Sequence, residues 1–447
     1  MKNRTYYLPM PLQILLAAIT FSIVFISCPP IEDETFENTI TLSGDLYSTT
    51  WTDTLDKIYK DGVPVKVDLS ACTVPASGSD ILKHVNEDGS DYTLDELNPY
   101  NNYIQFNASF GSRFGKQLIT TLILPDVATM INNASNNISI VSIEDAKNDE
   151  TDRYAFRHYS TLRSVSGKKI SLVGTFAFYN CKTLKDVNFP EAVIVMQYSF
   201  FGCTSLKNMR IETVRYIHQS AFENCSSLEK VECFDATSIE HRAFKNCTNL
   251  TEVVFPRARA IRTEAFRNCT SLKAARFHAS PIRTTEPSHP LDPYKSKTGI
   301  FTADTLAFHD NAFRGCKKLE VLDVRNAWNV YFAGGALADI GTHLELHLFD
   351  DNGDISFGHP QLDIYFGDMD KEDPHDKGQV TLKTVTIRAP TVPAGESRIE
   401  KDDPDDHYKQ GIVSDIKSRY AVDGNDENGK AIKKPVITVT VIRGPAS

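Results

Sequence analysis

Cysteine is the reactive residue that this sequence places most regularly. Between residues 174 and 277 a cysteine recurs every 22 residues, each time three residues after a phenylalanine. These cysteines are Cys181, Cys203, Cys225, Cys247 and Cys269. Thiols can form disulfides, bind zinc or act as nucleophiles, so their geometry decides which chemistry applies.

The spacing of the cysteines favours free thiols. A fixed period of this length is typical of stacked repeat coils, in which each unit buries its apolar face against its neighbours. Equivalent residues of stacked coils lie about 4.8 Å apart, whereas disulfide-bonded Cβ atoms prefer roughly 3.5–4.5 Å. Zinc would need several thiolates that converge on one point instead of a single file. We therefore predict free, buried thiols that act as small apolar side chains.

A histidine pair offers a second possible metal site. His343, Glu345 and His347 alternate along a predicted strand, so their side chains share one face. A His-x-His pair on a strand can hold zinc if a third ligand is present, but the motif is short and the same residues also suit an ordinary solvent-facing strand. We predict the solvent-facing role, and no metal or other cofactor.

A basic stretch is the candidate for partner binding. Seven cations follow one another with only Glu264 among them: Arg257, Arg259, Arg262, Arg267, Lys273, Arg276 and Arg283. If they form one positive patch, the patch would attract acidic proteins or sulfated and sialylated glycans. The alternative is an ordinary solvated surface.

Motifs for catalysis and nucleic-acid binding are missing from the sequence. It contains no phosphate-binding glycine loop, no nucleophile elbow and no HExxH, so we predict that the protein is not an enzyme. The formal net charge is −10, which argues against generic nucleic-acid binding. The acidic runs 368–376, 400–406 and 423–429 do not fit a calcium loop, because Asn428 stands where that loop needs glycine.

The N-terminal segment has the form of a secretion signal. Lys2 and Arg4 precede an apolar run, residues 12–26, that is too short for a comfortable membrane span. Cys28 follows and resembles the cleavage point of bacterial lipoproteins, at which the cysteine is acylated. We therefore predict a lipoprotein-type signal peptide at 1–27 and lipidation of Cys28. Phe25 departs from that pattern and leaves ordinary cleavage or a retained anchor open.

Each repeat has phenylalanine, cysteine and leucine slots in fixed order. They are filled by Phe178, Cys181 and Leu184; Phe200, Cys203 and Leu206; Phe222, Cys225 and Leu228; Phe244, Cys247 and Leu250; Phe266, Cys269 and Leu272; and Phe313, Cys316 and Leu319. Apolar residues three and five places after each leucine, such as Val253 and Phe255, indicate a short strand. The apolar residue four places before the Ala-Phe pair indicates a short helical or 3₁₀ turn. The Asn or Gly before each cysteine predicts a left-handed residue that closes this turn.

These repeats resemble a known family. The string at residues 239–256, I-x-x-x-A-F-x-N-C-x-x-L-x-x-V-x-F-P, is similar to the BspA-like (treponemal-type) leucine-rich repeat. The resemblance covers residues 118–336. It implies a β-rich solenoid, a right-handed curved array of 22-residue coils with short strands and short helical or 3₁₀ turns, capped at both ends. It also implies binding of protein partners at a bacterial cell surface, often in adhesion to host matrix or cell-surface proteins, and it carries no catalytic motif.

The remaining segments are predicted to flank or interrupt the solenoid. Residues 28–117 read as an acidic tether and an N-terminal cap, in which Trp51, Leu55, Ile58 and Tyr59 form a helical stripe and Val63–Leu69 a strand. A separate small domain is the alternative for this region. Residues 279–310 break the repeat with prolines, which predicts a surface loop or distorted coil. Residues 337–447 are predicted to hold degenerate repeats and a C-terminal cap.

The resemblance and the signal segment together predict a lipoprotein on the outer membrane or cell surface whose solenoid binds other proteins, of the host or of the bacterium. A scaffold that binds bacterial partners in the periplasm, or a secreted protein, is the alternative. Acidic glycans are a further class of partner that the basic stretch suggests, and the membrane is expected to be contacted only through the N-terminal lipid.

Overall fold

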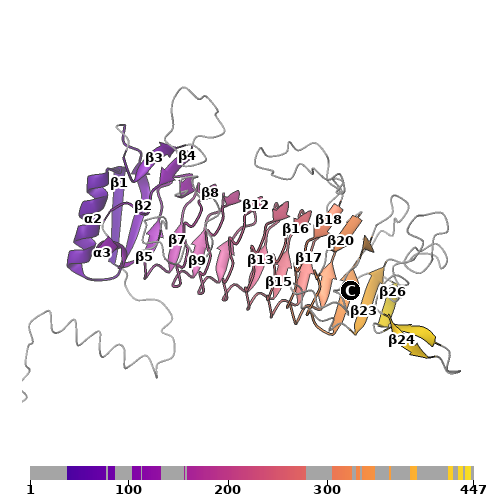
Figure 1. Ribbon diagram of the computed structural model, residues 1–447. Helices are drawn as coiled ribbons and strands as arrows, with labels where there is room; N and C mark the ends of the chain where they lie inside the picture. Colours follow the sequence, from indigo (N-terminus) through magenta and orange to yellow (C-terminus); the bar gives the residue numbers. More distant parts are fainter. Residues whose placement is uncertain are drawn as a thin grey trace, which may run out of the picture. The chain divides into compact units, whose positions relative to one another are not determined.

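The fold is that of a computed structural model (Figure 1). It describes residues 38–76, 79–85, 103–111, 113–131, 156, 159–277, 305–324, 329–332, 335–347, 362–363, 383–389, 421–425, 431–435 and 438–443. The predicted signal peptide, Cys28, Arg283 and most of the predicted 279–310 insertion lie outside these residues. The chain divides into two units, Met1–Asn38 and Thr39–Ser447, and all of the repeats belong to the second unit.

Short, mostly parallel strands form two rows that run along this unit (Figure 1). The first row begins with a six-stranded sheet: β1 (Asn38–Asp45), β2 (Val65–Thr73), β5 (Ile119–Ile123), β7 (Ser164–Ser166), β9 (Asp186–Asn188) and β11 (Asn208–Arg210). It continues with a seven-stranded sheet: β13 (Lys230–Glu232), β15 (Glu252–Val254), β17 (Ala274–Arg276), β19 (Val321–Asp323), β21 (His343–His347), β23 (Thr384–Ala389) and β26 (Thr438–Arg443).

An eleven-stranded sheet forms the second row. In order it holds β3 (Leu82–Val85), β4 (Tyr103–Phe106), β6 (Met130–Ile131), β8 (Leu172–Val173), β10 (Ile194–Val195), β12 (Tyr216–Ile217), β14 (Ser238–Ile239), β16 (Ala260–Ile261), β18 (Thr305–Phe308), β20 (Asn329–Phe332) and β22 (Leu362–Asp363). Within this sheet only β3 and β4 pair in the antiparallel sense among the described strands. A separate antiparallel pair, β24 (Ala421–Asn425) and β25 (Ala431–Pro435), lies near the end of the chain.

The strand register confirms the 22-residue coil. Asp186 pairs with Asn208 in the first row, and Ile194 pairs with Tyr216 in the second row, each 22 residues apart. Between β16 and β18 the register advances by 47 residues, from Ile261 to Phe308, and both rows continue across this longer interval. The unit is therefore a β-rich repeat solenoid, as the sequence predicts.

The core is a file of stacked phenylalanine rings. Phe178, Phe200, Phe222, Phe244, Phe266 and Phe313 are all 0–1% exposed. The centroids of successive rings are 5.0, 5.2, 5.1, 5.3 and 5.3 Å apart, and their planes are within 6° of parallel. The distance between ring centroids follows from the distance between neighbouring strands, because equivalent residues of successive coils stack directly on one another. The leucine slots of the six repeats are all buried beside these rings.

The turn that carries each phenylalanine differs from the sequence expectation. It is a run of consecutive turns and not a helical or 3₁₀ segment. Two residues in it adopt left-handed backbone: the predicted one before the cysteine, as at Asn246 (φ 62°), and another two residues before the phenylalanine, as at Arg242 (φ 58°). A left-handed residue every four positions prevents a continuous helix.

These turns add a further hydrogen-bonded ladder along the solenoid. Phe222 N donates to Ala243 O at 2.7 Å, and Asn224 N donates to Lys245 O at 2.8 Å, so each turn is bonded to the next coil. Asparagine side chains repeat this pattern, since Asn246 Nδ2 donates to Asn224 Oδ1 at 2.9 Å and Asn268 Nδ2 donates to Asn246 Oδ1 at 3.0 Å. Each coil is thus tied to its neighbours along both strand rows and along the turns.

An N-terminal cap precedes the regular coils. Its helix α2 (Ser48–Asp61) buries Trp51, Leu55 and Ile58 completely, and the short helix α3 (Arg113–Lys116) packs beside it. The helical stripe of the sequence analysis therefore holds for three of its four residues. Tyr59 is the exception, because it points outward and is 57% exposed. The predicted strand also begins later than expected, at Val65, and Val63 is exposed before it.

Candidate binding surface

The cysteine ladder is part of the core and not a reactive site. Within the described residues all eight cysteines are free and buried, Cys72 and Cys233 included. Each repeat thiol contacts the carbonyl oxygen of a phenylalanine in an earlier coil, as in Cys247 Sγ to Phe222 O at 3.2 Å. Burial raises the pKa of the Cys181 thiol to about 12 and that of Cys203 well above its usual range. Thiols that stay protonated in a closed core are poor nucleophiles and poor metal ligands.

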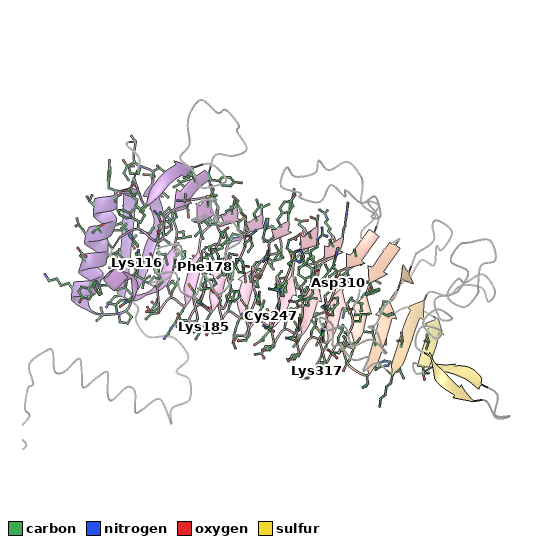
Figure 2. All side chains as sticks on the ribbon, viewed as in Figure 1. Lys116, Phe178, Lys185, Cys247, Asp310 and Lys317 are labelled. Atoms are coloured by element: carbon green, nitrogen blue, oxygen red, sulfur yellow. The ribbon has the colours of Figure 1, made fainter. Side chains whose placement is uncertain are left out.

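The outward side of the first strand row presents a regular polar surface, here called the sheet face. It consists of the first residue of β9, β13 and β15 and of the residue just before β9, β11, β13, β15 and β17: Lys185, Asp186, Lys207, Glu229, Lys230, Thr251, Glu252 and Lys273. All are exposed except the half-buried Glu252. Figure 2 shows Lys185 projecting away from the strands at this edge.

Backbone hydrogen bonds fix the positions of the sheet face residues. Lys207 N donates to Lys185 O at 3.0 Å, and Lys273 N donates to Thr251 O at 2.8 Å, so these side chains leave the backbone from adjacent coils. Their charges are of both signs and form loose ion pairs, such as Lys207 Nζ to Glu229 Oε1 at 3.7 Å. Such exposed pairs contribute little to stability, which leaves these charges able to contact a partner at small cost.

The six described cations of the basic stretch do not form one positive patch. Arg259 and Arg262 flank β16 in the second strand row, whereas Lys273 and Arg276 belong to the first row at β17. The structure also supplies carboxylates that the sequence order hides, since they come from the preceding coil. Arg257 Nη1 lies 3.1 Å from Asp235 Oδ1, and Arg276 Nε donates to Glu252 Oε1 at 3.0 Å.

Three cationic side chains bind the carboxylate of Glu264 on the turn side of the solenoid. Arg242 Nε and Lys245 Nζ donate to its Oε2 at 2.9 and 2.7 Å, and Arg267 donates to its Oε1. Burial raises the pKa of this carboxyl, but the hydrogen bonds and charges of Lys245 and Arg267 lower it more, to about 2. Arg267, one of the predicted partner-binding residues, is therefore engaged in a structural ion cluster.

A cluster of four aromatic residues was missed in the sequence analysis. Phe176 stacks on Tyr198 at 5.1 Å and Tyr179 on Phe201 at 5.0 Å, and together they form a small core apart from the main one. In a later coil the same slots hold the charged residues Arg242 and Lys245. The signal was present, because each aromatic pair is separated by 22 residues, but these slots are polar in other repeats.

The two histidines of β21 contact different residues. His343 Nδ1 lies 2.7 Å from Thr384 Oγ1, while His347 Nε2 lies 2.7 Å from Glu345 Oε1. No group of three or more His, Cys, Asp or Glu side chains that could hold a metal occurs within the described part of the chain.

Neither α2 nor α3, the helices of the described residues, has the length and hydropathy of a membrane-spanning helix.

A family model matches the repeats of this chain. Three overlapping segments, residues 114–197, 149–273 and 237–333, match the model of the BspA-type leucine-rich repeat region, with six copies. No curated protein gives a significant sequence match to the chain.

Several solved structures are similar to this chain at low identity. A T. pallidum leucine-rich repeat protein is 20% identical, with 60% of this chain and 88% of that chain covered and a TM-score of 0.33. A leucine-rich cell surface protein from Faecalibacterium prausnitzii is 15% identical, with 71% and 89% covered and a TM-score of 0.32. A leucine-rich repeat protein from Bacteroides ovatus is 15% identical, with 69% and 94% covered and a TM-score of 0.25.

The 22-residue coils, the stacked phenylalanine, cysteine and leucine slots and the family match lead to one assignment. Residues 114–333 are a BspA-type leucine-rich repeat region.

Proposed function

We propose that this protein is anchored at the bacterial surface and uses its leucine-rich repeat solenoid to bind macromolecular partners, foremost proteins of the host matrix or of host cell surfaces. The observation that carries the proposal is the sheet face, a regular array of exposed charged and polar side chains on adjacent parallel strands. Repeat arrays of this kind supply broad surfaces for protein recognition.

The rigidity of the backbone suits the sheet face to binding. Its strands are held by parallel register across successive coils and by the stacked core beneath them. A partner that binds there orders few backbone atoms, so little conformational entropy is lost on binding. The mixture of charges favours a partner with a complementary charge pattern over a generic polyanion.

The anchor is the second part of the proposal. Cys28 follows the apolar run 12–26 as in a lipoprotein signal, and acylation there would hold the solenoid at a membrane. A scaffold in the periplasm that binds bacterial partners is the alternative, since the sheet face would serve either role.

Reversing the charge of the sheet face tests whether it is the binding surface. Mature protein would be titrated against immobilised collagen, fibronectin and laminin, alongside a variant with Lys185, Lys207, Lys230 and Lys273 each changed to Glu. We expect the variant to lose at least about tenfold in affinity for any matrix protein that the wild type binds, because four favourable charge contacts become repulsive.

A matched control separates the sheet face from overall charge. Lys57 and Lys60 are exposed on α2, away from the strands of the sheet face, and their change to Glu should leave the affinity unaltered, whereas the same change at two sheet face lysines, Lys207 and Lys230, should weaken it. Equal loss in both variants would mean that net charge, and not the sheet face, governs binding. Absence of binding to every matrix protein and to host cells would contradict the adhesion role itself.

A further inference from the structure

The first strand row is interrupted at one place, which is the exception to the ties that join successive coils. β11 is the last strand of the six-stranded sheet and β13 is the first strand of the seven-stranded sheet, and no pairing joins these two described strands. They belong to consecutive coils, one repeat period apart. We call this place the β11–β13 junction.

The hydrogen bonds on either side of the junction show what is missing there. Lys207 N donates to Lys185 O at 3.0 Å in the coil before, and Thr251 N donates to Glu229 O at 2.9 Å in the coil after. Among the described residues, the bond that would continue this series, from Glu229 N to Lys207 O, is absent. The side chains of Lys207 and Glu229 form an exposed ion pair at 3.7 Å, which contributes little to stability.

The same two coils stay joined along the other two ladders. In the second row β12 pairs in register with β14. On the turn side Gly202 N donates to Glu223 O at 2.9 Å, and the stacked rings of Phe200 and Phe222 have centroids 5.2 Å apart. The coils are therefore held together at the second row and at the turns, while the first row is free to open between them.

The core is less completely closed at the junction. Met209 of β11 is half-buried, whereas Val187 and Val231, which hold the same slot in the neighbouring strands, are buried. Phe234, just after β13, is 46% exposed. Its backbone N donates to Glu212 O at 3.2 Å, so the interruption is confined to the strands themselves. Apolar surface is thus exposed where a gap between the strands would expose it.

The sequence of the two coils explains why β11 and β13 are held less firmly. In the coils on either side, Phe189 and Phe255 follow the strand and lie 6.2 and 5.9 Å from a ring of the phenylalanine file. The coils of the junction hold Ile211 and Cys233 in this slot, and the aromatic ring of the second coil is displaced to Phe234. Smaller side chains bury less apolar surface, so they hold the strands to the core less strongly.

We propose that the β11–β13 junction is a flexion point of the solenoid, at which the first row opens and closes while the second row and the turns hold the coils together. The described strands from β1 to β11, and again from β13 to β26, are paired without a gap. Opening the first row anywhere else would break backbone hydrogen bonds, whereas opening it here breaks none between strands. Bending motions concentrate at such weakly constrained positions.

The junction divides the sheet face into two parts. Lys185, Asp186 and Lys207 lie on one side, and the other members of the sheet face, from Glu229 to Lys273, lie on the other side. Each part keeps its rigid strands, but opening of the junction changes the angle and the distance between the parts. A partner that contacts both parts would select one angle, and fixing that angle would cost some of its binding free energy.

A distance measurement between two spin labels tests the flexion point without any partner. In the mature chain with Cys28→Ser, nitroxide labels would be attached at Lys207→Cys and Lys273→Cys, three coils apart across the junction. The eight cysteines of the described residues are buried, so the introduced thiols are labelled selectively. We expect a distance distribution at least about twice as wide as that of a control pair, because the labels move relative to one another.

The matched control carries its labels at Glu229→Cys and Glu320→Cys. These positions are also exposed and three coils apart, but they lie on the same side of the junction. Each labelled pair removes one partner of the Lys207–Glu229 ion pair, so its loss affects both variants equally. Circular dichroism shows whether both keep the fold. Distance distributions of equal width would overturn the inference.

Amide hydrogen exchange of the unlabelled chain is a second test. After correction for intrinsic rates, we expect the Glu229 amide to exchange at least about tenfold faster than the Thr251 amide, which is bonded across its own junction. The Lys207 amide, bonded to Lys185 O, should be protected like that of Thr251. Equal protection of Glu229 and Thr251 would mean a continuous first row and would contradict the flexion point. Neither test depends on the proposed binding function.

Discussion

Replacement of Phe244 by alanine is expected to lower the free energy of unfolding by about 3–5 kcal/mol, because it removes a fully buried ring. Phe244 is 0% exposed and lies between Phe222 and Phe266, at 5.1 and 5.3 Å. The cavity would interrupt the ring file in the middle of the solenoid, where backbone hydrogen bonds along both strand rows and along the turns hold the neighbouring coils rigidly. Urea unfolding followed by circular dichroism would measure the loss.

Cys247→Ala is the matched control for that prediction. It changes a buried residue of the same coil but removes only one sulfur atom and its contact with Phe222 O, so we expect a loss of about 1 kcal/mol. If Phe244→Ala were as mild as Cys247→Ala, the stacked-coil register would be wrong.

Gly115→Ala is expected to cost about 3 kcal/mol and to disrupt the N-terminal cap. The added Cβ would lie 2.2 Å from Leu55 O and 2.7 Å from Leu55 C, and backbone atoms cannot move aside as a flexible side chain can. α3 would have to separate from α2. The same unfolding measurement applies, with hydrogen exchange of α2 amides as a local readout.

Gly62→Ala is the control at the C-terminal end of α2. Gly62 is left-handed, with φ of 69°, but a Cβ there meets no atom within 4 Å. Its replacement should cost only the backbone strain, about 1 kcal/mol. Equal losses for the two variants would contradict the close packing of α3 on α2.

The repeat core could be predicted from sequence because its signal is redundant. In the first five repeats the phenylalanine, cysteine and leucine slots recur at one spacing, and each slot takes one residue type, so every coil supports the register of the others. The left-handed asparagines could be predicted for the same reason, since Asn or Gly precedes each repeat cysteine. The second left-handed position could not, because it holds Phe176, Ser220, Arg242 and Glu264, residue types that do not favour that conformation.

The basic stretch shows how sequence order conceals charge partners. Glu264 is the one carboxylate within that stretch, yet Arg257 and Arg276 pair with Asp235 and Glu252, more than 20 residues away from each. In a stacked solenoid the nearest opposite charge comes from a residue about one repeat period away in the sequence. A count of charges within one stretch therefore overestimates how positive the surface is. The prediction that Tyr59 is buried fails for a related reason. The helical stripe does not reveal that Trp51, Leu55 and Ile58 already fill the core.

Exposure of the solenoid on the exterior of the bacterial cell is the condition on which the proposed adhesion depends. Proteolysis of intact cells measures it, followed with antibody against the purified protein and with a periplasmic protein as a control for leakage. We expect the protein to be degraded while the periplasmic control survives. Full protection on intact cells, with degradation only after lysis, would contradict surface exposure and favour the periplasmic scaffold.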